Sequence, residues 1–417
     1  MKNRLLPVTC ALVLALSIPA TVLVAQSVQQ QQAQADRFKE LEEFLAVYRK
    51  VKLGYVDKVD DKQLMEGAIQ GMLASLDPHS AFLDKSDFSS LQTQIDGEYG
   101  GLGLTVTMED EAVKVIAPTK DTPADKAGIK SGDFITHLDG KLIVGGTLDE
   151  AVEAMRGAPG TTIKLSIFRP GRDAPFDVTL TRAIIDLKPV QWEVKDRIGI
   201  ISVTGFSEQT GADVVAAVAG IKKSLGSNPL GYIIDLRSNP GGILDEAVVV
   251  SDAFLKSGEI VSERGRDPRN VDRWWAERAV PGDVTGGAPI IVLIDAGSAS
   301  ASEIVAGALQ DHQRGLVMGE RSFGKGSVQN VLPLTRDTGL RLTVARYHLP
   351  SGRSVQEGGI KPDIRVPQLT DPDYKSRVSI RESDLRRHLV NELKDDTKDL
   401  EQDLKDDPRF AMTAEQL

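Results

Sequence analysis

Apolar positions between residues 37 and 95 recur at the three- and four-residue spacing of an amphipathic helix. Phe38, Leu41, Phe44, Leu45 and Tyr48 fall on one face of such a helix. A turn over residues 77–80, Asp-Pro-His-Ser, then interrupts a second helical pattern. This N-terminal helical region either packs its apolar face on its own domain or uses it as an oligomer arm.

From residue 97 to 183 the pattern changes to short strand-like runs. The runs cover residues 104–107, 113–116, 133–135, 162–168 and 176–181, with a turn at 123–129. One amphipathic helix interrupts them at 148–155, where Thr147 and Glu150 have the spacing of a capping box. The segment is therefore predicted to be a compact, β-rich module.

From residue 189 to 369, strands and helices alternate. Continuous apolar runs predict strands at 198–203, 230–236, 289–295 and 315–319, and helical patterns cover 211–225, 242–255 and 300–310. Alternation of this kind predicts an α/β core with a mostly parallel sheet covered on both faces. Catalytic groups of such a sheet lie at the carboxyl ends of its strands, which here lead into the loops 237–242, 296–300 and 320–326.

The two ends of the chain differ from the rest. Lys2 and Arg4 precede an apolar stretch from Leu5 to Ala25, so residues 1–25 are predicted to be a secretory signal peptide or an uncleaved membrane anchor. Both alternatives place the body of the protein outside the cytoplasm, in the periplasm or an equivalent compartment. The tail at 370–417 is strongly charged and is expected to be a solvated helix or partly disordered.

Composition removes several classes of function. The 417-residue chain has a formal charge of −10 and no basic stripe, so nucleic acid is not an expected partner. Its one cysteine, Cys10, lies in the N-terminal apolar stretch, and removal of that stretch would leave no thiol. No His/Asp/Glu cluster has metal-ligand spacing, so we expect neither a metal nor another cofactor.

Lys325 lies in a glycine-rich loop, and its role has three possible interpretations. Gly319–Lys325 matches most of a P-loop, but Gly326 stands where a magnesium-binding hydroxyl is needed, and the following residues read as a strand. Ser322 and Lys325 have the S-x-x-K spacing, which requires a helix that Gly324 and Gly326 disfavour. In the third interpretation, Lys325 serves a serine elsewhere in the chain.

Ser300 is the best partner because it begins a helix directly after a buried strand, where the helix dipole favours a developing anion. The Ala301 amide would be one oxyanion donor, and Gly241 or Gly242 could supply the second. A lysine base needs a pKa lowered by desolvation, and the neutral amide of Gln329 could hold the amine without adding charge.

Three segments together resemble the carboxy-terminal processing (tail-specific) serine proteases. They are Asp235–Gly242, Gly297–Glu303 (G-S-A-S-A-S-E) and Phe323–Gln329 (F-G-K-G-S-V-Q). The resemblance implies a ClpP/crotonase-like core with Ser300 as nucleophile, Lys325 as base and Gln329 as its orienting residue. The family's 25-residue spacing separates Ser300 from Lys325, whereas the neighbouring Ser298 and Ser302 lack it.

The 97–183 module resembles a PDZ domain, in which a Gly-rich loop binds a peptide carboxylate and a strand edge accepts the peptide. Mapped here, the loop and strand start are Gly100, Gly101, Leu102, Gly103 and Leu104. The resemblance also implies that PDZ engagement aligns the catalytic dyad. Arg156, at the end of the PDZ helix, is a candidate coupling residue, with an ordinary exposed arginine as the alternative.

The sequence thus predicts a secreted serine endopeptidase that acts on proteins or peptides with accessible C-termini. We expect a homo-oligomer; an adaptor protein and membrane association through the N-terminus are further candidate interactions. Two alternatives remain: a non-catalytic PDZ scaffold that retains the protease fold, and a Ser-His-Asp triad. None of the five histidines accompanies an obvious strand-end aspartate, which disfavours the triad (His79, His137, His312, His348 and His388).

Overall fold

The computed structural model describes residues 38–109, 111–172, 174–267, 269–276, 282–368 and 380–393. The signal or anchor prediction for residues 1–25 and most of the charged tail lie outside this part of the chain. The chain divides into two compact units between Met72 and Leu73. Within the described ranges, no helix combines the length and apolar character needed to cross a membrane.

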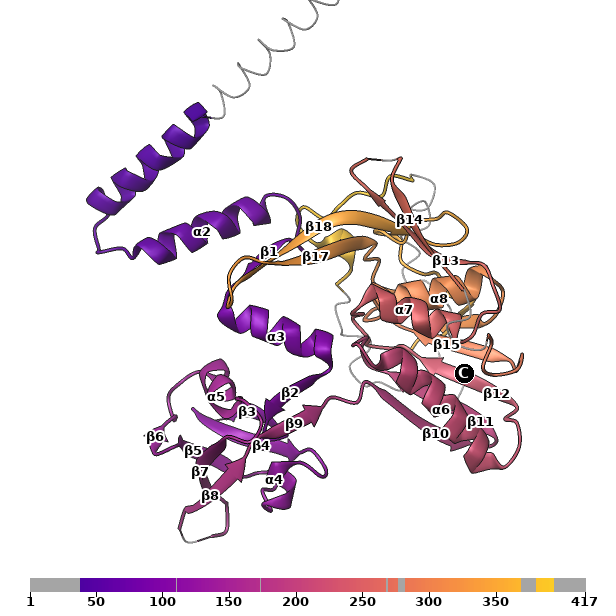
Figure 1. The fold of residues 1–417 in the computed structure, drawn as a ribbon, viewed down its shortest axis with the longest axis horizontal. Helices are drawn as coiled ribbons and strands as arrows, with labels where there is room; N and C mark the ends of the chain where they lie inside the picture. The colour runs from indigo at the N-terminus through magenta and orange to yellow at the C-terminus, as the bar shows by residue number, and fades with distance from the viewer. Residues whose placement is uncertain are drawn as a thin grey trace, which may run out of the picture. The chain divides into compact units, whose positions relative to one another are not determined.

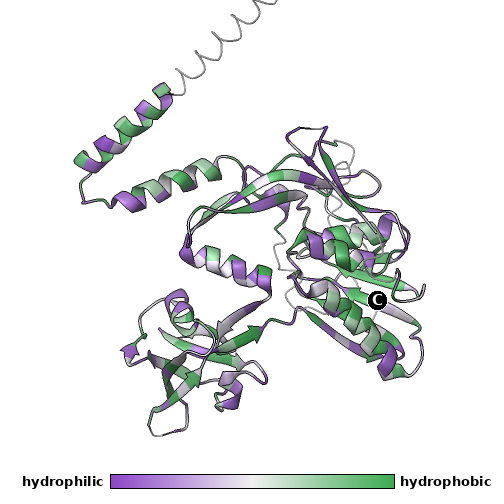
Figure 2. Cartoon of the chain, viewed as in Figure 1, coloured by the Kyte–Doolittle hydropathy of each residue, from purple (hydrophilic) through white to green (hydrophobic). Residues whose placement is uncertain are grey.

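The described part of the first unit, residues 38–72, is helical, as predicted. Residues 38–54 form one helix, and α2 (Asp61–Ala74) begins after a short turn. The two helices are joined by a hydrogen bond from the Tyr48 hydroxyl to Asp61 (2.7 Å), and Figure 2 shows hydrophobic and hydrophilic positions alternating along both. Four of the predicted apolar positions are exposed in the structure: Phe38, Leu41, Phe44 and Leu45.

The turn at 77–80 leads into a strand that the sequence pattern did not predict. β1 (Ala81–Leu83) follows the turn, and α3 (Lys85–Asp96) completes the helical region. The Asp84 side chain caps α3 by accepting from the Asp87 amide, which fixes where the helix begins.

The PDZ-like module is an antiparallel sheet in the order β3-β4-β5-β7-β8, with the short β6 paired to β5. Thr147 and Glu150 form the predicted capping box at the start of α5. The predicted turn at 123–129 instead begins with the one-turn helix α4, which Pro123 starts. The bounds are β3 Leu104–Glu109, β4 Ala112–Pro118, α4 Pro123–Lys126, β5 Phe134–Leu138, β6 Lys141–Leu142, α5 Leu148–Met155, β7 Thr162–Phe168 and β8 Phe176–Thr181.

The chain enters and leaves this module through a two-stranded ribbon. β2 (Glu98–Gly101) pairs antiparallel with β9 (Ala183–Asp186). The ribbon therefore lies between the module and the segments on either side of it, α3 and the first strand of the core (Figure 1).

The core contains a six-stranded sheet in the order β10-β11-β12-β15-β16-β19, in which only the β10–β11 pair is antiparallel. The predicted mostly parallel sheet is confirmed. Helices α6, α7 and α8 accompany it (Figure 1). The bounds are β10 Val190–Lys195, β11 Ile198–Val203, α6 Thr210–Leu225, β12 Gly231–Asp235, α7 Leu244–Asp252, β15 Ile290–Ile294, α8 Ala301–Asp311, β16 Leu316–Gly319 and β19 Ile364–Arg365.

Coverage of this sheet is uneven. Burial alternates residue by residue along β11, β12 and β15, so one side of each strand is fully buried and the other only partly covered. No residue of these three strands is exposed, so both faces of the sheet are covered, as predicted. The central strands are largely hydrophobic (Figure 2), and Ile201, Ile234 and Val292 are completely buried.

A second, antiparallel sheet has the order β1-β18-β13-β14, with β17 also paired to β18. β17 was anticipated from the sequence, and so was a β segment at His348, where β18 ends. β18 is its longest strand and pairs with β1, β13 and β17, so it gathers segments that are far apart in the chain (Figure 1). The bounds are β13 Glu259–Gly265, β14 Val271–Trp275, β17 Ser327–Pro333 and β18 Gly339–His348.

Candidate active site

Ser300 occupies a strained turn between β15 and α8. Its backbone has φ 55° and ψ −114°, a region that residues other than glycine rarely adopt. A sharp strand-to-helix turn of this kind exposes a serine hydroxyl at the end of a sheet. The side chain of Ser300 lines a cavity of about 360 Å³ at this point.

The two neighbouring serines are occupied elsewhere. The Ser298 hydroxyl donates to the Leu236 carbonyl (2.8 Å), and the Ser302 hydroxyl donates to the Asn239 carbonyl (2.9 Å). Both side chains are fully buried and neither lines the cavity. Among the three serines of this segment, Ser300 is the one in position to attack a substrate.

Lys325 and Gln329 line the same cavity. The Lys325 amine donates to Gln329 Oε1 (2.5 Å) and to the Ser327 carbonyl (3.1 Å). No hydrogen bond of the described residues joins this amine to the Ser300 hydroxyl. The base and the nucleophile therefore share a cavity without being engaged.

Desolvation lowers the pKa of Lys325 to about 8. The carboxylates of Glu382, Glu303 and Asp77 act against this shift, and Arg341 contributes to it. A lysine with a pKa near 8 is partly neutral at physiological pH, which is what a general base requires.

The two glycines after Pro240 have different roles. The Gly241 amide donates to Asn239 Oδ1 (2.9 Å), and Gly241 is not among the residues that line the cavity. Gly242 does line it, together with Ala301. Of the two candidates for the second oxyanion donor, Gly242 is the one that faces the cavity.

Both glycines are needed for the close approach of this loop to its neighbours. A Cβ on Gly241 would lie 2.7 Å from the Ala299 carbonyl oxygen, and one on Gly242 would lie 2.1 Å from that of Phe206. Both residues also have positive φ angles, of 99° and 151°. The loop can therefore lie against the start of α8 only because neither residue carries a side chain.

Glu303 is a site residue that the sequence analysis missed. Its fully buried carboxylate accepts four hydrogen bonds, from the Ser300 amide (2.7 Å), the Ser322 hydroxyl (2.6 Å), the Gly324 amide (2.7 Å) and the Lys325 amide (3.0 Å). Burial raises the pKa of Glu303 to about 7, although these hydrogen bonds oppose the shift. Its position three residues into α8, the capping-box position, was the available signal.

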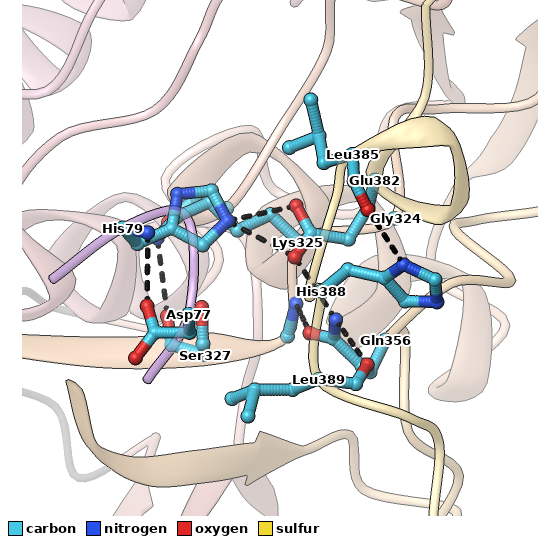
Figure 3. Close-up of polar contacts among 12 residues, drawn as sticks. Asp77, His79, Gly324, Lys325, Ser327, Gln356, Glu382, Leu385, His388 and Leu389 are labelled. Carbon is cyan, nitrogen blue, oxygen red and sulfur yellow. Dashed lines mark hydrogen bonds and ion pairs between the residues drawn. The ribbon is translucent and has the colours of Figure 1, made fainter. Parts of the chain in front are cut away.

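His79 also lines the cavity, and the sequence analysis had dismissed it. Its Nε2 lies 2.8 Å from Glu382, a fully buried carboxylate of the segment 380–393 that also accepts from Gln356 (3.0 Å; Figure 3). His79 thus has a carboxylate partner after all. No hydrogen bond of the described residues links His79 to Ser300, and its carboxylate partner is a glutamate of the C-terminal segment and not a strand-end aspartate.

A second cavity, of about 400 Å³, lies in the PDZ-like module. Four of the five predicted carboxylate-loop residues line it (Gly101, Leu102, Gly103 and Leu104), and α5 contributes Val152 and Met155. Gly100 does not line this groove, because it packs against the Gly157 carbonyl. A Cβ on Gly103 would lie 2.4 Å from Thr122, so glycine there also serves the fold.

Arg156 is not an ordinary exposed arginine. Its guanidinium stacks over the Tyr99 ring at 5.3 Å and donates to the Thr93 hydroxyl at 3.5 Å. The side chain lines the groove and is one-quarter exposed. It therefore connects α5 with β2 and α3, the segments by which the chain enters the module.

Comparison with known proteins identifies this arrangement. A model of peptidase family S41 matches residues 197–366, a PDZ domain model matches 100–180, and a model of the activating protease CtpB N-terminal domain matches 16–87. The chain is 48% identical over 377 residues to the carboxy-terminal-processing protease of Bartonella bacilliformis, a match that covers 90% of this chain and 86% of that protein. The chain belongs to the carboxy-terminal processing peptidases of family S41.

More distant relatives agree with this. The carboxy-terminal processing protease CtpA of Bacillus subtilis is 35% identical over 331 residues, 78% of this chain and 68% of that protein. Among solved structures, the photosystem II D1 C-terminal processing protease matches with 29% identity and a TM-score of 0.45, covering 83% of this chain and 98% of that one. The peptidase and PDZ family models, with the 48% identical relative, show that this S41 peptidase is a serine protease with a PDZ domain.

The described residues contain no group of three or more His, Cys, Asp or Glu side chains that could hold a metal ion. The polar side chains that line the catalytic cavity of this S41 peptidase include two hydroxyls, two amides, an amine, an imidazole, a guanidinium and a phenol (Ser300, Ser327, Gln94, Gln329, Lys325, His79, Arg341 and Tyr347). Such a set can carry out acyl transfer by itself.

The low pKa of Lys325 predicts the pH dependence of the peptidase. With the neutral Lys325 amine as the base, the prediction is that kcat/KM rises about tenfold per pH unit and levels off above pH 8. Glu382→Gln removes a negative charge that raises the pKa of Lys325, so the rise should move to lower pH. The measurement is kcat/KM for a short peptide between pH 5 and about pH 10.

Glu392→Gln is the matched control. Glu392 lies in the same C-terminal segment but is exposed and paired with Arg346, so its removal should leave the midpoint unchanged. An unshifted or raised midpoint in Glu382→Gln would contradict the assignment of the pH dependence to Lys325.

Proposed function

We propose that this S41 peptidase is an extracytoplasmic endopeptidase that cleaves proteins after its PDZ domain has captured their C-termini. Ser300 is the nucleophile, Lys325 the general base and Gln329 the residue that orients the amine. The observation that carries this assignment is a single cavity that holds a strained serine at a helix start and a lysine with a pKa of about 8.

In this mechanism the neutral Lys325 amine accepts the Ser300 proton while Oγ forms a bond to the scissile carbonyl carbon. The carbonyl oxygen becomes an oxyanion held by the amides of Ala301 and Gly242. Lys325 then protonates the leaving amine as the C–N bond breaks. The neutral lysine then takes a proton from water as the water oxygen bonds to the acyl carbon. The bond between that carbon and Ser300 Oγ breaks, and Lys325 returns the proton to Oγ.

The cavity must rearrange before this chemistry can begin. In the structure the Lys325 amine is bound to Gln329 and Ser327, and no hydrogen bond of the described residues joins it to the Ser300 hydroxyl. We place the trigger in the PDZ domain, where Arg156 contacts both the peptide groove and the Tyr99 ring. A bound C-terminus would then favour the arrangement in which Lys325 reaches Ser300.

Cleavage of casein or a tagged peptide tests the dyad. Ser300→Ala and Lys325→Ala should each lower kcat by a factor of about 10³ or more, because each removes a reacting group. Labelling by a fluorophosphonate should disappear in Ser300→Ala and persist in Ser298→Ala and Ser302→Ala. Activity retained in either dyad variant would refute the assignment, and no cleavage by the wild type is the outcome that the non-catalytic scaffold requires.

The role of the PDZ domain is tested on the ligand, because substitution of Gly103 would also disturb the fold. A peptide with a free C-terminal carboxylate should bind and activate at least about tenfold better than its C-terminal amide, since hydrogen bonds to a charged group contribute about 1.5–3 kcal/mol. Arg156→Gln should weaken activation while peptide cleavage at saturating substrate persists. Arg172→Gln, an exposed PDZ arginine that stacks on Phe176, is the control.

Location and assembly are parts of the same proposal. The N-terminal pattern at residues 1–25 and the exposed apolar positions at Phe38, Leu41, Phe44 and Leu45 support an exported homo-oligomer. The same features are compatible with a membrane anchor and with binding of an adaptor protein. Fractionation of cells expressing a tagged chain, followed by light scattering, should find the protein outside the cytoplasm with the mass of more than one chain. A cytoplasmic monomer would contradict both parts.

A further inference from the structure

Asp77 is a buried carboxylate that the catalytic mechanism above does not use. It is 4% exposed and lies in the turn before β1, more than two hundred residues from the catalytic segments in sequence. β1 pairs with β18 through Ala81 and Arg341, so this turn lies beside Thr343. Asp77 therefore reaches the sheet that carries Gln329.

Hydrogen bonds connect Asp77 to the catalytic lysine in three steps. Thr343 Oγ1 donates to Asp77 Oδ1 (3.0 Å), Gln329 Nε2 donates to Thr343 Oγ1 (3.1 Å), and the Lys325 amine donates to Gln329 Oε1 (2.5 Å). Gln329 Nε2 also donates to the Ser327 hydroxyl (2.9 Å). Each group in this series is partly or fully buried.

The direction of these bonds is fixed by Asp77. Burial alone would raise the pKa of Asp77, but hydrogen bonds from Ser80, His79 and Thr343 lower it below its ordinary value. The group is therefore a carboxylate, which can only accept. Thr343 has one hydroxyl hydrogen, so it must present a lone pair to Gln329, and the Gln329 amide must turn its NH₂ group to Thr343.

The orientation of this amide decides what Lys325 encounters. When Gln329 Oε1 faces the lysine, it accepts a hydrogen bond from the Lys325 amine. The lone pair of the neutral amine then stays free to take the Ser300 proton. With the amide reversed, Nε2–H would donate to that lone pair and compete with proton transfer. A reversed amide would therefore suppress the base without moving any backbone atom.

We propose that Asp77 is a positioning residue for the general base: through Thr343 it fixes the orientation of the Gln329 amide and so keeps the Lys325 lone pair available. The proposal rests on the roles assigned above to Lys325 and Gln329. Bonds from Ser80 and from the His79 amide also make Asp77 the first residue of a tight turn. The test must therefore separate positioning from turn formation.

Thr343 provides that separation. Asp77→Asn alone is ambiguous, because Asp77, like Glu382 and Glu303, also acts on Lys325 as a charge, which Arg341 opposes. Thr343→Val removes the hydroxyl and leaves the charge and the turn in place. Thr343→Ser restores the hydroxyl and is the conservative rescue.

Steady-state cleavage of a short peptide by the full chain is the measurement. We expect Thr343→Val and Asp77→Asn each to lower kcat by about tenfold to a hundredfold with little change in KM, within the usual contribution of general-base catalysis. Thr343→Ser should stay within a few fold of wild type. The double variant Asp77→Asn/Thr343→Val should have a kcat no lower than that of the less active single variant, because both substitutions interrupt the same series of hydrogen bonds.

Two further variants keep the test decisive if Thr343→Val folds poorly. In a Gln329→Leu background there is no amide to orient, so adding Asp77→Asn should not lower kcat again. The relay from Asp77 to Lys325 would be refuted if Asp77→Asn lowered kcat further in the Gln329→Leu background. It would also be refuted if a folded Thr343→Val variant kept the wild-type kcat. Lys325→Ala distinguishes the two proposals: if it is inactive while Thr343→Val is fully active, only the relay fails, whereas an active Lys325→Ala refutes the dyad itself.

Discussion

The catalytic cavity depends on one buried carboxylate, that of Glu303. Leaving such a group without partners inside a protein would cost several kcal/mol, and Glu303 has four donors. They come from the start of α8 and from the loop before β17, so the same side chain holds both catalytic segments. The Tyr347 hydroxyl also links the two segments, since it lies within hydrogen-bonding distance of the carbonyls of Ser300 (3.1 Å) and Lys325 (2.5 Å).

The hydrogen bonds of Glu303 and Tyr347 limit how far the segments that carry Ser300 and Lys325 can move apart. With the backbones of Ser300 and Lys325 joined through two buried side chains, a hinge that moves one catalytic segment away from the other would break several hydrogen bonds at once. What remains free to change is the Lys325 side chain and the Asn239–Gly242 loop. In the structure the Lys325 amine is bound to Ser327 and Gln329, and the loop is held by the bond from the Gly241 amide to Asn239.

Sequence patterns predicted the parts of this site that depend on local structure. Ser300 follows a continuous apolar strand and begins a helix, and the module at 97–183 has regular strand periodicity and a capping box. The residues that were missed act over long sequence separations. β18 carries a mixed pattern of polar and apolar residues because it is the shared partner of β1, β13 and β17, and so neither the antiparallel sheet nor the Asp77–Thr343 contact has a local signature. Glu382 was missed because its contact with His79 also spans a long sequence separation, and because the sequence around it has the pattern of a charged tail.

The segment between β11 and α6 shows how the PDZ domain could reach the oxyanion loop. The Phe206 amide donates to the Gly241 carbonyl, and the Phe206 carbonyl accepts from Ile243. Two residues later, the Glu208 amide donates to the Ile95 carbonyl at the end of α3. α3 also carries Thr93, which Arg156 contacts from the PDZ helix. Backbone hydrogen bonds thus join the glycine pair to the helix that Arg156 touches. An effect of the PDZ domain on the loop that carries Gly242 can therefore act through this short series of hydrogen bonds. The loop, unlike the braced serine and lysine backbones, can respond by releasing one hydrogen bond, that from the Gly241 amide to Asn239.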